Sequence, residues 1–360
     1  MVHHPLETNN YIMKTNANSE TNALSILGAD ISSLQRALDL GARYFYEDKT
    51  EGDPLQILMD HGVNTIRLRV WVNPPHGYNN KKKVVEFASK VKSRGFKLLV
   101  DLHYSDTWAD PGHQVKPAAC ANYDFLKLKK ALYEHTFEVC NALKSAGASP
   151  EMIQVGNEIN PGMLLPDGGT SNWENLSALL KQGYNAVKAC LPSTQVMLHT
   201  ANAGDKAGVL TWFDNAQSHG VQWDTIGLSY YSYWHGTVES MEETVKSVKS
   251  RYGKPVIIVE TAYPFTFEGN DDEQNVIHPT GNLPLDYPVT PAGQAGNLAA
   301  VMNGARSAGA MGVFYWEPTW TAVKGNNWDP FNPASGSQWE NQALFDYNSI
   351  ALPAMKEFKP

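Results

Sequence analysis

The feature that most constrains the fold of this chain is a set of eight short apolar runs that recur at intervals of about 30 to 50 residues. They cover residues 24–30, 65–72, 97–104, 152–159, 194–200, 224–231, 255–261 and 312–318. Most of them are continuously apolar, which is typical of parallel strands that are buried on both faces. The sequence therefore predicts eight parallel strands.

Helical patterns lie between these runs, most clearly at residues 82–93, 125–146, 173–190, 241–252 and 292–308. Gly95, Gly147, Gly253 and Gly309 follow four of them, as expected at helix ends. Eight alternations of strand and helix favour an α/β fold with a single (β/α)₈ TIM barrel over an open, doubly wound sheet. No glycine-rich nucleotide motif follows the first strand, and long loops at 263–290 and 320–342 follow strands seven and eight.

Composition is consistent with one large domain and argues against several classes of partner. With 360 residues, 42% of them hydrophobic, the chain can bury one core, which we expect to span residues 24–360. The net charge is −8, and the longest basic run is Lys81-Lys82-Lys83. This balance disfavours nucleic acid and anionic membranes as partners, and we expect a monomer.

The first 23 residues are polar and lack the apolar segment of a signal peptide. We interpret them as an N-terminal extension, with Met1-Val2-His3-His4 resembling the remnant of an expression tag. We expect the natural chain to be secreted behind a signal that is now removed. Cys120, Cys140 and Cys190 allow at most one disulfide, and the sequence does not choose the pair.

Two glutamates, Glu158 and Glu260, each close one of the apolar runs. Taken singly, each could be a helix first-turn carboxylate or part of a surface ion pair. In a barrel, however, strands four and seven put them on opposite sides of one mouth, where catalytic residues gather. A buried carboxylate is costly unless it is paired, hydrogen-bonded or catalytic. Two facing carboxylates are what glycoside hydrolysis requires, and their separation decides whether the sugar configuration is retained or inverted.

Several motifs occur in order along the chain and carry a family resemblance. They are residues 28–32 (GADIS), 67–71 (RLRVW), 101–106 (DLHYSD), 108–111 (WADP), 154–158 (QVGNE), 229–231 (SYY), 234–236 (WHG), 259–263 (VETAY), 314–318 (FYWEP) and 341–346 (NQALFD). Over about residues 24–358 the chain resembles the glycoside hydrolase family of arabinogalactan endo-β-1,4-galactanases, within the larger clan of barrels that use a pair of glutamates.

The resemblance implies endo-cleavage of β-1,4-galactosidic bonds in the galactan and arabinogalactan side chains of pectin. It also implies a retaining double displacement with Glu158 as acid/base and Glu260 as nucleophile. The physics agrees, because the Glu260 charge would raise the pKa of Glu158, while Arg67 or Arg69 could keep Glu260 ionised. We therefore expect a secreted glycoside hydrolase with no organic cofactor and a polysaccharide substrate.

Further residues at the strand ends are candidates for substrate contacts. Asn157 could bind the sugar 2-hydroxyl, although it could also be an ordinary helix N-cap. His103, His199 and His235 lack zinc-site spacing, so we interpret them as hydrogen-bond donors to substrate or to the glutamates, with His235 the first choice. We expect Trp316 beneath the sugar at the cleavage point, with Trp108, Trp320 and Trp328 stacking on neighbouring rings unless they are core residues. The expected substrate-binding set is Arg67, Trp108, Asp110, Asn157, His199, Tyr231, His235, Trp316 and Trp328.

The loop after strand seven carries oxygen side chains at alternate positions: Glu268, Asn270, Asp272 and Gln274. Calcium takes six to eight oxygen ligands. The family resemblance implies a calcium ion between this loop and the next, where Ser337 and Glu340 match in position. A solvated acidic loop is the alternative.

Three other functions remain open at this stage. A mannanase or cellulase of the same clan would share the catalytic pair, because the axial 4-hydroxyl of galactose is read by groove details that the sequence does not supply. A barrel that binds glycans without cutting them is disfavoured because both carboxylates are present. A metal-dependent hydrolase lacks a ligand cluster.

Overall fold

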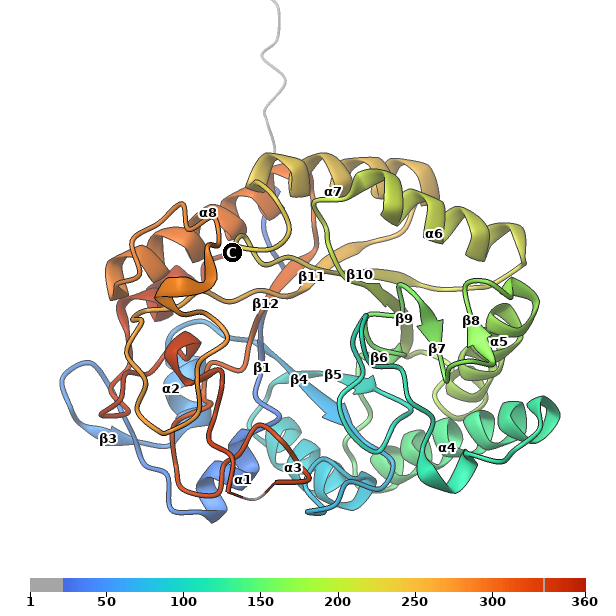
Figure 1. Ribbon diagram of the computed structural model, residues 1–360, viewed down its shortest axis with the longest axis horizontal. Helices are drawn as coiled ribbons and strands as arrows, with labels where there is room; N and C mark the ends of the chain where they lie inside the picture. Colours follow the sequence, from blue (N-terminus) through green and yellow to red (C-terminus); the bar gives the residue numbers. More distant parts are fainter. Residues whose placement is uncertain (1–21, 333) are drawn as a thin grey trace, which may run out of the picture.

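The computed structural model describes residues 22–332 and 334–360 as a closed barrel of parallel strands with helices outside it (Figure 1). Going round the barrel, the strands are β1 (Ile26–Asp30), β4 (Thr65–Val70), β5 (Lys97–Leu102), β6 (Met152–Val155), β9 (Gln195–Thr200), β10 (Thr225–Ser229), β11 (Val256–Glu260) and β12 (Gly312–Trp316). β12 pairs with β1 and closes the barrel. The predicted (β/α)₈ fold is confirmed.

The helices are α1 (Leu34–Asp39), α2 (Pro54–Asp60), α3 (Lys81–Ser93), α4 (Phe125–Ser145), α5 (Trp173–Cys190), α6 (Lys206–Ser218), α7 (Val238–Tyr252) and α8 (Pro291–Ala308). Two small hairpins pair β2 (Tyr44–Phe45) with β3 (Glu51–Gly52) and β7 (Gly162–Met163) with β8 (Gly168–Gly169). Short 3₁₀ turns are η1 (Ala118–Cys120), η2 (Pro279–Gly281), η3 (Glu340–Gln342) and η4 (Pro353–Glu357).

Three helices, α1, α2 and α6, were not among the clearest predicted patterns, although α6 carried a readable signal. Asp205 caps its first turn by accepting a hydrogen bond from the backbone N–H of Gly208. Its buried residues Val209, Trp212, Phe213 and Ala216 follow helical spacing. The glycines that were expected to end helices do so, since Gly253 and Gly309 are left-handed C-caps of α7 and α8.

The expected strands are all present, but several were predicted to run too far at their carboxyl ends. The clearest case is β6, which ends at Val155 rather than at residue 159. Gly156 (φ +85°) and Glu158 (φ +47°) are left-handed, so the chain turns sharply away from the sheet there. A Cβ on Gly156 would lie 2.7 Å from Ile159 Cγ2, so this turn requires glycine. Residues that read as strand therefore already belong to the loops at the barrel mouth.

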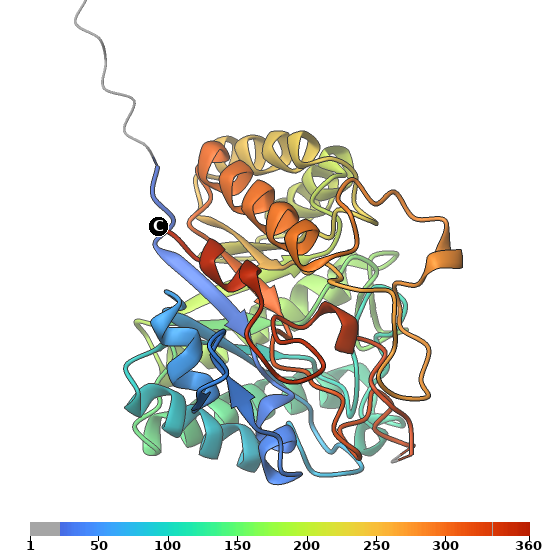
Figure 2. The same cartoon turned by 90° about the vertical axis from the view of Figure 1, so that its left-hand side faces the viewer.

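The barrel interior is apolar at one end and polar at the other. Its apolar end is a separate cluster formed by Ile26, Leu99, Met152, Met197, Ile257, Val259 and Phe314. Because side chains alternate along a strand, the next inward positions toward the carboxyl ends are Asp101, Gln154 and His199, and on β1 Asp30 follows beyond Gly28; all of these polar residues are buried. Figure 2 shows the loops after β11 and β12 on the side to which the strands point. The fold therefore collects polar side chains below those loops.

Two further predictions concern the ends of the chain and the cysteines. Among the described residues, no helix is both long and apolar enough to cross a membrane. Cys120, Cys140 and Cys190 are free thiols, the last two of them buried. Of the proposed extension at residues 1–23, residues 1–21 lie outside the described part of the chain.

Candidate active site

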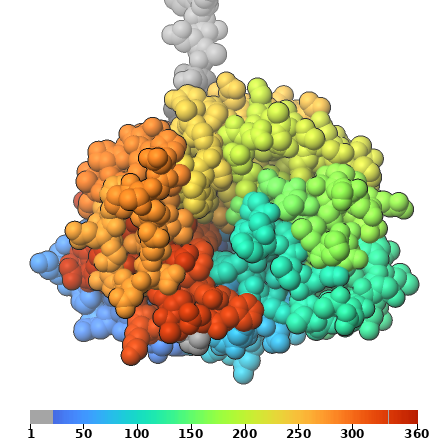
Figure 3. Space-filling model, viewed as in Figure 1, coloured from blue at the N-terminus to red at the C-terminus, as the bar shows by residue number. Residues whose placement is uncertain are grey.

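A cavity of about 810 Å³ opens at the carboxyl ends of the strands, within the size range of ligand sites. Figure 3 shows the hollow between segments that are far apart in the sequence. Both Glu158 and Glu260 line it. Of the other expected site residues, Trp108, Asp110, Asn157, Tyr231, His235, Trp316 and Trp328 also line it.

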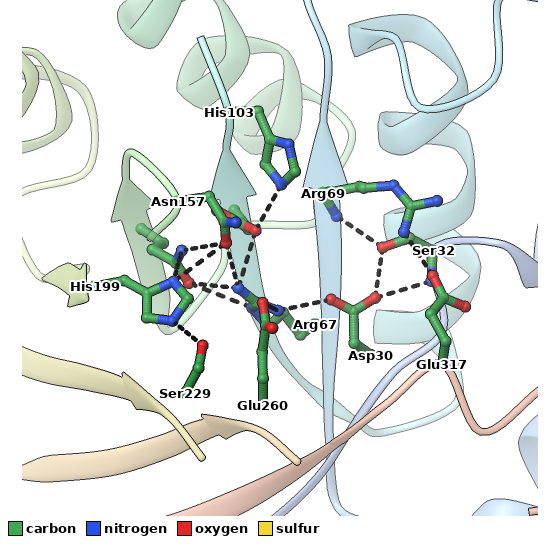
Figure 4. Close-up of polar contacts among 12 residues, drawn as sticks. Asp30, Ser32, Arg67, Arg69, His103, Asn157, His199, Ser229, Glu260 and Glu317 are labelled. Carbon is green, nitrogen blue, oxygen red and sulfur yellow. Dashed lines mark hydrogen bonds and ion pairs between the residues drawn. The ribbon is translucent and has the colours of Figure 1, made fainter. Parts of the chain in front are cut away.

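Arg67 lies outside the cavity lining, although it was expected as a substrate contact. It is fully buried in the middle of β4 and forms the centre of a polar layer beneath the cavity (Figure 4). Its guanidinium donates to the carboxylates of Asp30, Asp101 and Glu260, each at 3.0 Å. It also donates to the side-chain oxygens of Gln154 and Asn157. Arginine presents five donors in a planar fork, and this layer uses all of them.

Glu260 enters the barrel because β11 contains one extra residue relative to β10. Leu228 pairs with Ile258 but Ser229 pairs with Glu260, so Val259 is a bulge. Val259 joins the apolar cluster inside the barrel, and the bulge turns the next side chain inward as well. Glu260 then accepts from Arg67 on Oε1 at 3.0 Å and from the Tyr231 hydroxyl on Oε2 at 2.9 Å.

The surroundings of the two glutamates favour protonation of Glu158. Burial, followed by the nearby charges of Glu260 and Asp110, raises the pKa of Glu158 well above its usual value. Burial also raises the pKa of Glu260, but the Arg67 guanidinium and the Tyr231 hydroxyl oppose that rise. Because Glu260 accepts from the Arg67 guanidinium and Glu158 does not, a proton is more stable on Glu158 than on Glu260.

Asn157 and Glu158 are presented by the left-handed turn after β6. The Asn157 amide is buried, accepts from Arg67 at 2.9 Å and donates to the carbonyl of Ala109 at 2.6 Å. Asn157 therefore does not cap a helix, which was its alternative role. Glu158 remains partly exposed to the cavity, next to Asn157. A non-glycine residue in this conformation persists only where its surroundings hold it, as at many functional sites.

The three histidines after the strands differ in their placement. His103 lines the cavity and accepts on Nδ1 from the Trp71 indole N–H and the Ala109 backbone N–H, so its Nε2–H faces Asp101 at 3.1 Å. His235 also lines the cavity, and burial lowers its pKa to about 4. His199 is fully buried and lies outside the lining, contrary to the expectation of a substrate contact.

Arg69 contacts Glu317 and Trp108, whereas Arg67 is the arginine that pairs with Glu260. Arg69 pairs with Glu317, which is fully buried, also accepts from the Ser33 hydroxyl and has a pKa raised to about 7 by burial. The Arg69 guanidinium carbon lies 4.3 Å from the centre of the Trp108 ring. This geometry is a cation–π contact that holds the Trp108 ring from one side.

The tryptophans form a continuous aromatic cluster along the cavity. Trp108 and Trp328 stack with ring centres 5.1 Å apart, and Trp316 meets Trp339 edge-on at 4.8 Å. Trp320 stacks behind Trp328 at 5.3 Å but is 1% exposed and lies outside the lining, so it is a core residue here. The cavity thus presents flat apolar faces beside its two carboxylates.

Several site residues were missed in the sequence. Gln154, Asp101 and Ser229 join the polar layer around Arg67 or its neighbours. Each is a polar residue at an inward-facing position of a buried strand. The alternation of inward and outward positions along the strand was the signal that could have identified it. Trp234 and Trp339 also line the cavity; Trp234 begins the WHG motif at residues 234–236, whereas nothing in the local sequence of Trp339 separates it from a core tryptophan.

The loops after β11 and β12 contact each other, but with the opposite alternation from the one expected. The side chains of Glu268, Asn270, Asp272 and Gln274 are exposed. Asp271 instead accepts from the backbone N–H of Ser337 at 2.7 Å, and Glu340 accepts from the backbone N–H of Asn270. Among the described residues, no group of three or more His, Cys, Asp or Glu side chains is arranged to hold a metal.

Comparison with known proteins agrees with this geometry. Residues 26–358 match the model of glycosyl hydrolase family 53. An arabinogalactan endo-β-1,4-galactanase of Cellvibrio japonicus (strain Ueda107) is 37% identical over 92% of this chain and 90% of its own length. The Ignisphaera aggregans GH53 catalytic domain has a TM-score of 0.88 at 35% identity, with 95% of this chain and 97% of that chain covered. A structure of fungal β-1,4-galactanases has a TM-score of 0.82 at 30% identity, with 93% and 99% covered. This chain therefore belongs to glycosyl hydrolase family 53.

Proposed function

We propose that this protein is an endo-β-1,4-galactanase that cleaves galactan by a retaining double displacement. The observation that carries the mechanism is the asymmetric pair of carboxylates in one cavity. Glu260 accepts from a guanidinium and a phenol, which stabilise its anion, whereas burial and the charges of Glu260 and Asp110 outweigh the Arg67 charge at Glu158 and favour its neutral form. Relatives named as galactanases support galactan as the substrate. The catalytic unit comprises residues 24–360.

In the first step, the Glu260 carboxylate attacks the anomeric carbon while Glu158 gives its proton to the departing glycosidic oxygen. The bond to that oxygen breaks, and a galactosyl ester forms on Glu260. Esterification removes the Glu260 charge, which was one cause of the raised pKa of Glu158. Glu158 therefore becomes a base, takes a proton from water, and the resulting attack on the anomeric carbon releases the sugar and restores Glu260.

The aromatic cluster and the polar wall of the cavity have separate tasks in this proposal. Trp316, Trp108 and Trp328 offer flat faces to sugar rings on either side of the cleavage point. Asp110, Tyr231 and His235 supply polar contacts from the cavity wall. Arg67 and His199, which lie in the layer below, contribute by holding the residues that contact the sugar.

The function is tested by measuring the release of reducing ends from β-1,4-galactan, β-1,4-mannan and cellulose side by side. We expect galactan to be cut with a fall in viscosity that precedes extensive sugar release, and the first product to keep the β configuration by proton NMR. Glu158→Gln and Glu260→Gln should each lower kcat by at least about a hundredfold without changing the circular dichroism spectrum. Preference for mannan or cellulose, an inverted product, or near-native turnover of either variant would refute the assignment.

We also propose a structural calcium ion between the loops after β11 and β12. Glu340 is buried, its Oε2 lacks a hydrogen-bond partner, and so does the buried side-chain oxygen of Asn275. The Asp271 carboxylate lies close enough to help raise the pKa of Glu340 to about 7, after burial as the larger cause. Such unsatisfied oxygens fit a hard cation, which these three residues would bind and which would link the two loops that wall the cavity. The ion takes no part in the reaction.

We further infer that the protein is secreted and works as a monomer on the galactan side chains of pectin. A polysaccharide of cell-wall size does not enter cells, so the enzyme must reach it outside. The cavity is built from one chain, with both carboxylates and the tryptophans at strand ends and on loops of the same barrel.

A further inference from the structure

His199 has an unusual position for a residue behind an active site, because it contacts two consecutive residues of the turn that carries Glu158. Its imidazole Nδ1 lies 3.2 Å from the backbone N–H nitrogen of Glu158. Its own carbonyl accepts from the backbone N–H of Ile159 at 3.0 Å. The side chain is fully buried at the end of β9 and does not reach the cavity.

The proton on this imidazole can be located from its neighbours, beginning with Arg67. A guanidinium is only a donor, so the Gln154 oxygen must face it and does so at 3.1 Å. The Gln154 amide nitrogen therefore faces His199 Nδ1, at 2.8 Å. Two N–H groups, from Gln154 and from Glu158, thus converge on Nδ1. The side-chain oxygen of Asn157 also lies 3.2 Å from Nδ1, but it already accepts from Arg67 at the shorter distance of 2.9 Å. Nδ1 therefore accepts and carries no proton.

The other ring nitrogen, Nε2, faces an acceptor. Nε2 carries the proton and lies 2.7 Å from the Ser229 hydroxyl oxygen, which accepts it. A charged imidazolium would point a second N–H at the donors of Gln154 and Glu158. Burial and the Arg67 charge also disfavour it, and they lower the pKa of His199 well below its usual value. The ring is therefore neutral, in a single tautomer.

We propose that His199 is a positioning residue for the acid/base: its unprotonated Nδ1 fixes the turn that presents Glu158, and Ser229 selects the required tautomer. The turn needs such support because Glu158 adopts a left-handed conformation that side chains rarely take. This inference rests on the proposed role of Glu158. It assigns His199 an accepting contact with the backbone of the enzyme, in place of a donating contact with the sugar.

Two substitutions of His199 separate positioning from simple packing. His199→Asn puts an amide oxygen near the place of Nδ1 and can still accept from the Glu158 N–H. His199→Gln reaches the place of Nε2 and leaves the Glu158 N–H without its acceptor. We expect His199→Gln to lower kcat/KM on galactan by about tenfold to a hundredfold, a part of what general acid catalysis contributes, and His199→Asn to keep most of it.

The substrate's leaving group shows whether the acid is affected. A 2,4-dinitrophenyl β-galactobioside needs no protonation to depart, so kcat/KM of His199→Gln on it should change by less than about threefold. Glu158→Gln, measured in parallel, should show the same selective loss on galactan. If Glu158→Gln lacks this pattern, the proposed acid is wrong. The positioning role is overturned if Glu158→Gln shows this pattern but kcat/KM of His199→Gln falls equally on both substrates or on neither. It is also overturned if His199→Gln and His199→Asn have the same kcat/KM on galactan.

A measurement on the unmodified enzyme covers the case in which a variant does not fold. Nitrogen-15 NMR distinguishes protonated from unprotonated imidazole nitrogens. The His199 signals can be assigned because they are absent from the spectrum of His199→Asn. If that variant does not fold, they can be assigned as the imidazole signals that change position in Ser229→Thr. We expect an unprotonated Nδ1 and a protonated Nε2 throughout about pH 5 to 8, where an ordinary histidine titrates. A protonated Nδ1 anywhere in that range would overturn the proposal.

Discussion

Arg67→Met tests the polar layer beneath the cavity, because it removes the one cation that three buried carboxylates share. Asp30, Asp101 and Glu260 each lose a 3.0 Å contact, and the Arg67 side chain is fully buried. Stranding one partner of a buried ion pair costs about 3–5 kcal/mol. With an unfolding entropy of about 2.1 cal/mol/K per residue over roughly 340 described residues, the melting temperature should fall by at least about 4–7 °C at pH 7.

The pH dependence of this loss identifies its cause. Burial raises the pKa of Glu260 and Arg67 opposes that rise, so in the variant Glu260 holds a proton in the folded state that it releases in the unfolded chain. The unfolded state then binds fewer protons, so the variant's stability falls as pH rises. The difference in melting temperature between wild type and Arg67→Met should therefore be larger at pH 7 than at pH 4.5.

Calorimetry of four proteins at both pH values checks the prediction. Arg67→Lys keeps the charge but loses the planar fork, so it should fall between wild type and Arg67→Met. Arg43→Met removes the same charge from an exposed pair with Glu51 and should leave the melting temperature unchanged. A loss below about 2 °C at pH 7, or an equal loss at both pH values, would refute the view that buried carboxylates depend on Arg67.

Two further predictions concern protonation. Tyr231→Phe removes a hydroxyl that lowers the pKa of Glu260. The acidic limb of the pH profile of kcat/KM on galactan should therefore move to higher pH. An acidic limb at the wild-type pH would contradict this role of Tyr231. Burial raises the pKa of Glu340 to about 7, so the stability that Glu340 contributes without metal is present at low pH and is lost as pH rises through about 7. Calcium should offset that loss and raise the melting temperature more at pH 8 than at pH 5. Glu340→Gln should abolish the calcium response and exposed Glu268→Gln should keep it, whereas equal responses at both pH values or in both variants would exclude this site.

Much of the active site was predictable because a parallel barrel leaves little freedom at its strand ends. Eight apolar runs predict eight strands, and a polar residue that closes such a run must lie at the barrel mouth. Glu158, Glu260 and Tyr231 were found in this way, whereas Trp108 and Asp110 lie in the loop after the third run, and Asp110 was expected from the family resemblance. The ends of the strands were less predictable, since the left-handed turn at residues 156–158 reads as extended chain.

The loops were predictable in position but not in orientation. Their length marked residues 263–290 and 320–342 as functional, yet the alternation of Glu268 to Gln274 pointed outward and left Asp271 and Asn275 facing in. An irregular loop has no sheet to fix which of two alternating sets is buried. The same holds for Trp320, which packs as core, and Trp339, which lines the cavity.

What the amino-acid order alone determined is the set of strands, the barrel and the two glutamates at its mouth, because hydrophobic periodicity and strand parity are local properties. The tertiary structure decided which arginine pairs with which glutamate. It assigned Arg67 to Glu260 and Arg69 to Glu317, and it put His199 behind Glu158 instead of beside the sugar. These pairings join residues up to 248 positions apart, and they follow from barrel closure and the β11 bulge, which no local pattern encodes.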